Sequence, residues 1–150
     1  MKILVIDKDG LISACLATVE AELLCHHDEI QALNAAEMQQ PAMIFLAYAL
    51  RGEETPDFIR MLTDAAPATR LVVIGGHMID DAIIQCVLAG AKGFQEQAQL
   101  PNYTARLIQA LLNGEAWLSR KCVARLIDSI RLLQLSSKNA RMLQNKRFAP

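Results

Sequence analysis

Short apolar runs alternate with segments of helical periodicity through the first 112 residues. The runs are short and mostly apolar, which predicts strands at residues 2–6, 29–33, 42–46, 71–74 and 92–95. Apolar residues spaced three and four apart predict helices at residues 11–24, 35–40, 57–65, 80–89 and 102–112. Within this pattern, residues 25–28 are expected to form a turn, and Asn34 is expected to cap the second helix.

Five strand–helix units predict an α/β fold in which helices cover both faces of a parallel sheet. Five units in about 115 residues fit a flavodoxin-like, doubly wound sheet with strand order 2-1-3-4-5. A sixth helix is expected from Arg120 to about Leu135, with a polar linker candidate at residues 136–139, or else prolonged to Lys146. We therefore expect one domain at residues 1–118 and an added helix with a basic linker at residues 119–150.

Composition agrees with one globular domain, since 53% of the 150 residues are hydrophobic and 21% are charged. The longest apolar stretch, residues 41–50, is too short for a membrane span, which needs about 20 residues. The N-terminus reaches Asp7 without the apolar core of a signal peptide, so we expect a cytoplasmic protein. The four cysteines form no CxxC pair, and neither a disulfide nor a metal site is expected. No catalytic arrangement can be placed from the sequence, so the chain is not expected to be an enzyme.

The net charge of −1 conceals a strong asymmetry along the chain. Residues 1–100 carry six Lys or Arg and fourteen Asp or Glu, whereas residues 101–150 carry nine and two. A basic tail on an acidic domain favours an anionic partner near the C-terminus, a nucleic acid or a nucleotide. The alternative is a solvated helix face with no such partner.

Two segments carry a family resemblance: residues 87–94 (VLAGAKGF) and 107–119 (LIQALLNGEAWLS). They resemble the receiver domain of NarL/FixJ (LuxR-type) response regulators. The resemblance implies a CheY-like fold, a role in two-component signalling, and control of transcription. It also implies a DNA-binding domain beyond this chain, because residues 147–150 resemble the linker that precedes one. Lys138, Arg141, Lys146 and Arg147 would then either contact DNA phosphates or belong to a solvated linker.

In that family an aspartate after the third strand accepts a phosphoryl group, and an acidic pair after the first strand holds Mg²⁺. A hydroxyl and a lysine after the last two strands bind the phosphoryl oxygens. The resemblance maps these roles onto Ala47 as acceptor, Asp7 and Lys8 with the neighbouring Asp9 as acidic pair, Gly75 as hydroxyl and Gln97 as lysine. A degenerate receiver without phosphotransfer is therefore expected. The alternative is an alignment slip in which Asp57 or Asp9 is the acceptor.

The stretch Trp117, Leu118, Ser119 and Arg120 resembles the W-[FLM]-[ST]-R pattern of VpsT-like biofilm regulators, which bind cyclic di-GMP there. Arg presents a planar fork to phosphate or guanine, and Trp offers an aromatic face. The Ser hydroxyl and the helix N-terminus add donors for an anion. The resemblance thus implies a cyclic di-GMP site at these four residues. The alternative is that Trp117 packs in the domain and Ser119 caps the helix.

The final helix carries an apolar stripe, the residues Val123, Leu126, Ile127, Ile130 and Leu133. The stripe lies beyond the five-unit fold, so it packs either on its own domain or on a second copy in a homodimer. A regulator that dimerises, with or without cyclic di-GMP, is the first hypothesis. A ligand-free module for protein–protein interaction is the second.

Overall fold

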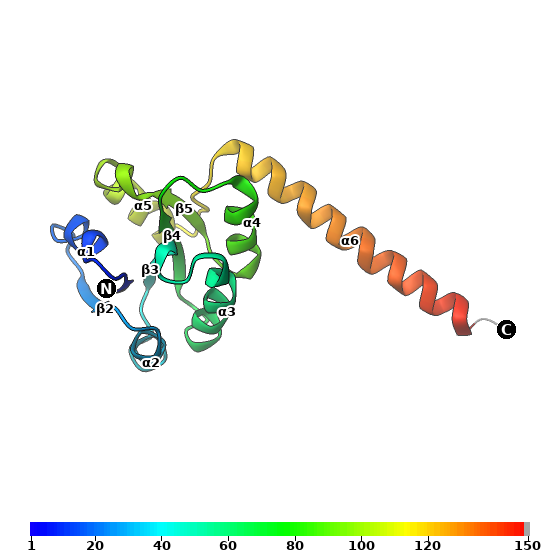
Figure 1. Ribbon diagram of the computed structural model, residues 1–150, viewed down its shortest axis with the longest axis horizontal. Helices are drawn as coiled ribbons and strands as arrows, with labels where there is room; N and C mark the ends of the chain where they lie inside the picture. Colours follow the sequence, from blue (N-terminus) through cyan, green and yellow to red (C-terminus); the bar gives the residue numbers. More distant parts are fainter. Residues whose placement is uncertain (149–150) are drawn as a thin grey trace. The chain divides into compact units, whose positions relative to one another are not determined.

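The computed structural model describes the backbone of residues 1–148 and the side chains of residues 1–144. Within it the chain divides into two compact units, Met1–Leu118 and Ser119–Pro150. The first unit is built on a five-stranded sheet whose paired strands are all parallel (Figure 1). Its strands are β1 (Lys2–Ile6), β2 (Glu22–His26), β3 (Met43–Ala47), β4 (Arg70–Gly75) and β5 (Gly93–Glu96). Their order, β2-β1-β3-β4-β5, confirms the predicted fold class.

Helices cover both faces of this sheet, as its two apolar cores show (Figure 1). On one face pack α2 (Glu29–Gln39), α3 (Thr55–Ala65) and α4 (Asp80–Ala89). On the other face pack α1 (Leu11–Cys15) and α5 (Leu100–Leu112). The 3₁₀ turns are η1 (Tyr48–Leu50), η2 (Gly52–Glu54) and η3 (Gln97–Gln99).

Alternate residues of the strands supply the two cores. In β1, Leu4 and Ile6 face the α2–α4 side, whereas Ile3 and Val5 face the α1–α5 side. All four of these side chains are fully buried. This two-sided burial explains why the central strands β1, β3 and β4 are almost continuously apolar rather than alternating.

The predicted order of elements is wrong between residues 11 and 40. The helix expected at residues 11–24 ends at Cys15, and residues 22–26 form β2. This segment pairs with β1 and forms one edge of the sheet. Its Glu22 and Cys25 side chains are exposed. An edge strand with exposed polar residues lacks the uniform apolar run that marks the central strands.

The strand expected at residues 29–33 is the start of α2. Asp28 is its N-cap, because the Asp28 carboxylate accepts a hydrogen bond from the Gln31 N–H at 3.1 Å. Asn34, the predicted cap, lies inside the helix. The turn expected at residues 25–28 is also wrong, since Cys25 and His26 belong to β2.

The second unit consists of α6 (Arg120–Phe148). The helix is continuous through residues 136–139, so the linker candidate there is wrong and the longer of the two predicted helices is closer. Across residues 1–148 no helix is both long and apolar enough to cross a lipid bilayer.

Candidate functional site at the carboxyl edge of the sheet

Four of the residues singled out by the sequence lie at the carboxyl ends of neighbouring strands. Asp7 follows β1, Ala47 ends β3, Gly75 ends β4 and Gln97 follows β5. Because the strands are parallel and in register, these ends share one edge of the sheet. In open α/β sheets this edge is the usual place for ligands.

Asp7 is the buried acid of this edge, with only 1% of its surface exposed. Its Oδ2 accepts a hydrogen bond from the Ile12 N–H at 3.1 Å, while its Oδ1 is buried without a hydrogen-bond partner in the described part of the chain. The Nδ1 atom of His27 lies 3.8 Å from Oδ1 and 2.6 Å from the Asp7 carbonyl oxygen. His27 was missed because the sequence placed it in a turn before the second strand rather than just after it.

The two residues that follow Asp7 are not buried. Lys8 and Asp9 are both exposed in the turn after β1. The Asp9 Oδ1 accepts a hydrogen bond from the Leu11 N–H at 3.1 Å, which engages it at the start of α1. Asp7 is therefore the one acidic side chain of this stretch that is buried.

The residues at this edge do not fit the Mg²⁺ ion that the receiver fold implies. Mg²⁺ is held octahedrally by oxygens, usually through one or two carboxylates. Asp7 offers one free carboxylate oxygen, Lys8 is a cation, and Ala47 has no side-chain oxygen. Among the described residues, no three histidine, cysteine or acidic side chains gather where they could hold a metal ion.

Apolar atoms fill the space beside Gly75. A β-carbon built there would lie 2.9 Å from the Sδ of Met78 and 3.3 Å from ring and side-chain carbons of Phe94 and Tyr48. A serine or threonine at this position would therefore have to displace Met78. The neighbouring Gly76 has open space around it, so the crowding is specific to position 75.

Two ionisable side chains near the end of β3, Tyr48 and Cys86, are kept neutral. Burial raises the pKa of the Cys86 thiol to about 11, and burial, followed by the nearby Cys86 and Glu53, raises the pKa of Tyr48. Both groups therefore stay protonated at neutral pH, and the Cys86 thiol is not an activated nucleophile.

Asp57 and Asp9, the alternative acceptors, do not end a strand. Asp57 lies in the first turn of α3, where its Oδ1 pairs with Arg60 at 2.8 Å. Asp9 is exposed and engaged by the Leu11 N–H. Neither occupies the position of Ala47 at the end of β3.

Trp117 extends the sheet beyond β5. Its N–H donates to the Lys92 carbonyl, and its carbonyl accepts from the Phe94 N–H, each at 3.0 Å. The indole Nε1–H donates to the Oε1 of Gln95 at 2.9 Å, and the ring meets Tyr103 edge-on at 6.2 Å. Trp117 is thus half-buried and has its indole donor satisfied, through a partner, Gln95, for which the sequence held no signal.

The two residues that open the second unit differ in their surroundings. The Ser119 Oγ accepts a hydrogen bond from the Cys122 N–H at 3.1 Å, which caps α6. Arg120 is exposed, and Leu118 at the end of the first unit is half-buried.

The apolar stripe is largely uncovered in the described chain. Val123, Ile127, Ile130 and Leu133 are between 38% and 57% exposed, and Leu126 is half-buried. Lys138 and Arg141 are exposed on the same helix. The side chains of Lys146 and Arg147 lie outside the described residues.

Comparison with known proteins rests on structure alone, because no protein-family model and no curated protein sequence matches the chain. The isolated REC domain of RcsB from Salmonella enterica serovar Typhimurium superposes with a TM-score of 0.73 at 13% identity. That match covers 85% of this chain and 98% of the other. The fold is that of a response-regulator receiver domain.

Two LuxR-family structures support the same receiver fold. A two-component response regulator from Aurantimonas sp. SI85-9A1 has a TM-score of 0.69 at 18% identity, covering 87% of this chain and 97% of that one. A DNA-binding response regulator from Silicibacter pomeroyi has a TM-score of 0.66 at 23% identity, covering 81% and 98%. At these identities the likeness concerns the receiver fold and not the residues at its carboxyl edge.

Proposed function

We propose that this chain is a pseudo-receiver: a receiver-fold signalling module that works without phosphotransfer and transmits its signal by self-association through α6. The observation that carries the first half is Ala47 at the carboxyl end of β3. A methyl group has no lone pair with which to attack a phosphoryl group. DNA binding would belong to a separate domain, as the sequence resemblance implies.

Three further features support the loss of phosphotransfer. The edge offers a Mg²⁺ ion only one buried carboxylate among the described residues, that of Asp7, because Lys8 follows it and Ala47 has no side-chain oxygen. A β-carbon at position 75 would lie 2.9 Å from the Sδ of Met78, so a residue with a hydroxyl there would require Met78 to shift. Gln97 stands in place of the lysine and carries no positive charge to neutralise a phosphoryl group.

The exposed stripe supports self-association. Four large aliphatic side chains on successive turns of α6 are at least a third exposed. An apolar row of this kind on a long basic helix is typical of an interaction surface. We propose a homodimer in which the stripe is buried.

Intact-mass measurement tests the loss of phosphotransfer directly. After incubation with acetyl phosphate and Mg²⁺, the mass of the folded chain should be unchanged, because no aspartate sits at the end of β3. A phosphoryl adduct on any aspartate of residues 1–100, Asp57 and Asp9 included, would refute the proposal.

Cyclic di-GMP binding is a second candidate function, favoured by the exposed Arg120 at the start of a basic helix. Trp117 and Ser119 already have partners within the chain, so Arg120 is the member of the four-residue pattern that is best able to contact a ligand. A guanidinium on a phosphate or a guanine edge forms a charge-assisted, bidentate pair.

Titration with cyclic di-GMP, followed by calorimetry, decides whether this second function exists. If Arg120 contacts the ligand, Arg120→Ala should weaken binding about 10- to 1000-fold, since each 1.4 kcal/mol is tenfold. Arg131→Ala, further along the same helix, is the matched control and should bind as the original chain does. Absence of binding by the original chain at about 100 μM ligand would leave the ligand-free interaction module, and equal binding by all three proteins would remove Arg120 from the site.

A further inference from the structure

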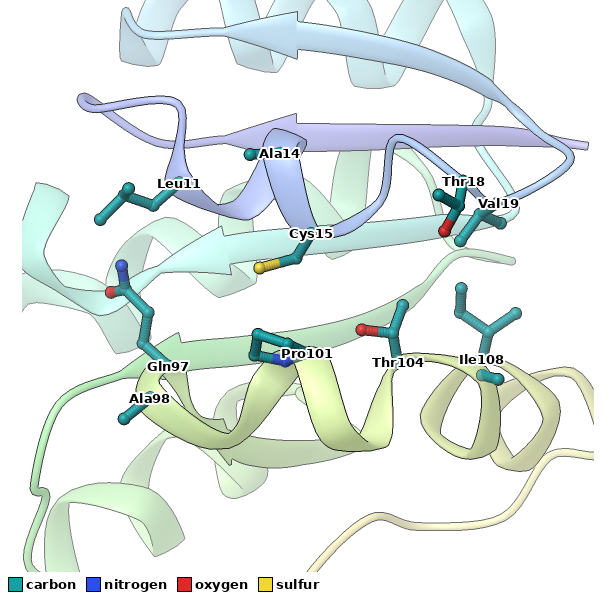
Figure 2. Close-up of a pocket in the computed structure, with 11 residues that line it drawn as sticks. Leu11, Ala14, Cys15, Thr18, Val19, Gln97, Ala98, Pro101, Thr104 and Ile108 are labelled. Atoms are coloured by element: carbon teal, nitrogen blue, oxygen red, sulfur yellow. The ribbon is translucent and has the colours of Figure 1, made fainter.

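An open groove runs between α1 and α5 on one face of the receiver fold. It has a volume of about 980 Å³ and is lined by uncharged side chains from Leu11 to Val19 on one wall and from Gln97 to Ile108 on the other. Figure 2 shows Leu11 and Cys15 across the groove from Pro101 and Thr104. We name this feature the α1/α5 groove.

The shortness of α1 explains the groove. Five residues give α1 a length of about 7 Å, whereas the thirteen residues of α5 span about 20 Å. Past Cys15 the chain turns, and Thr18 and Val19 form the wall there instead of a second helical turn (Figure 2). A helix of this length can cover only part of α5, which leaves the groove open beside it.

We propose that the α1/α5 groove of one protomer receives the apolar stripe of α6 from a second copy of this chain. This inference rests on the proposed function, because it names the surface that the stripe meets in the dimer. Each protomer has one groove and one stripe, so a two-fold dimer would contain the contact twice. The arrangement is a helix-in-groove interaction exchanged between identical chains.

The dimensions of the two surfaces agree. The second wall of the groove runs from Gln97 in η3 to Ile108 in α5, which is about 18 Å at rises of about 2.0 Å per residue in η3 and about 1.5 Å per residue in α5. The stripe from Val123 to Leu133 covers about 15 Å by the α-helical rise. Aliphatic side chains of α6 would thus meet apolar or uncharged side chains along most of the wall.

Charge favours this occupant over a second α6. The Met1–Leu118 unit carries fifteen acidic and seven basic residues, whereas residues 119–150 carry one acidic and eight basic. Two α6 helices side by side would therefore repel each other, and α6 on the receiver fold of a partner would attract.

Charges close to the groove also suit a basic helix. Asp9, Glu20 and Glu96 are exposed and lie within two residues of lining residues in the sequence. Of the two nearby cations, Lys8 is exposed, and the Arg106 guanidinium is held over the Tyr103 ring at 5.0 Å. Among the residues close in sequence to the lining, acidic side chains therefore outnumber basic ones.

Two single variants separate the groove from the stripe. Ala105 lines the groove and is exposed, so Ala105→Arg should block it without disturbing the core. Ile127→Arg places a charge in the stripe. Each should raise the dimer dissociation constant about tenfold or more in sedimentation equilibrium, and circular dichroism should confirm that each still folds.

Matched controls lie on the same helices but off both surfaces. Gln109→Arg puts the same charge on an exposed position of α5 that does not line the groove. Leu132→Arg replaces an exposed apolar residue of α6 that lies outside the stripe. Both controls should dimerise as the original chain does.

Mixing the two variants gives the decisive result. A dimer of one Ala105→Arg chain and one Ile127→Arg chain keeps one intact groove facing one intact stripe, so the mixture should associate more tightly than either variant alone. Raising the salt concentration should weaken association, because opposite charges are screened.

Three outcomes would overturn the inference, and they are distinguishable. If Ile127→Arg associates as the original chain does, the stripe is not an interface and the proposed function itself fails. If Ile127→Arg is monomeric while Ala105→Arg dimerises normally, the stripe is an interface but the groove is not its counterpart. Association that strengthens with salt, with no recovery in the mixture, would indicate pairing of two α6 helices instead.

Discussion

Gly93 lies against the backbone of Trp117, at the point where the chain returns to the edge of the sheet. A β-carbon at position 93 would collide with the Trp117 carbonyl oxygen and lie 2.8 Å from the Trp117 Cβ. The lack of a side chain at Gly93 therefore permits the two hydrogen bonds that bind Trp117 alongside β5.

Gly93→Ala should detach Trp117 from β5. We expect a loss of about 1–3 kcal/mol in the free energy of unfolding, with a red shift in the fluorescence of Trp117, the single tryptophan of the chain. Gly76→Ala is the matched control, because nothing lies within 4 Å of a β-carbon there. Equal stability and unchanged fluorescence in both variants would show that Trp117 is not held by this contact.

The sequence was enough to locate the residues at the ends of strands. It was not enough to identify the side chains that contact them in the folded chain. Ala47 and Gly75 follow uniformly apolar runs, so their position at the edge of the sheet was predictable. Tertiary packing alone brings Met78 beside Gly75 and places the Gln95 amide oxygen where it accepts the Trp117 indole N–H. No periodicity or motif encodes contacts of that kind.

At the scale of elements, the apolar pattern of the sequence located the central strands but missed the edge strand β2. Central strands buried on both faces are marked by continuous apolar runs, whereas β2 pairs on one side only and exposes Glu22 and Cys25. The residues of α1 and the turn after it have apolar spacing that suits a longer helix, yet the helix ends at Cys15. Propensity is overridden there by the pairing of β2 with β1.

The start of α2 offers a test of this revised assignment. Asp28→Ala should remove the cap and lower the free energy of unfolding by about 1 kcal/mol. Asn34→Ala, inside the helix, should leave it unchanged or raise it slightly, because alanine has the higher helix propensity. The reverse ranking in urea titrations would show that the helix begins at Asn34.

At the scale of the whole molecule, alternation of elements was enough to predict the fold class and the strand order, despite the error around β2. Right-handed crossovers and helices on both faces leave few arrangements for five parallel strands. What α6 binds could not be obtained in the same way, because an apolar stripe indicates a surface but not its partner. The division of charge between the two units is the basis on which we propose an acidic partner surface for α6.

Sedimentation of the full chain, over a range of concentrations, with and without acetyl phosphate and Mg²⁺, tests the central claim most directly. A phosphorylation-independent, self-associating module predicts a monomer–dimer equilibrium with the same dissociation constant in both conditions. A chain that stays monomeric at every concentration, or a dimer that forms only when acetyl phosphate is present, would contradict the account.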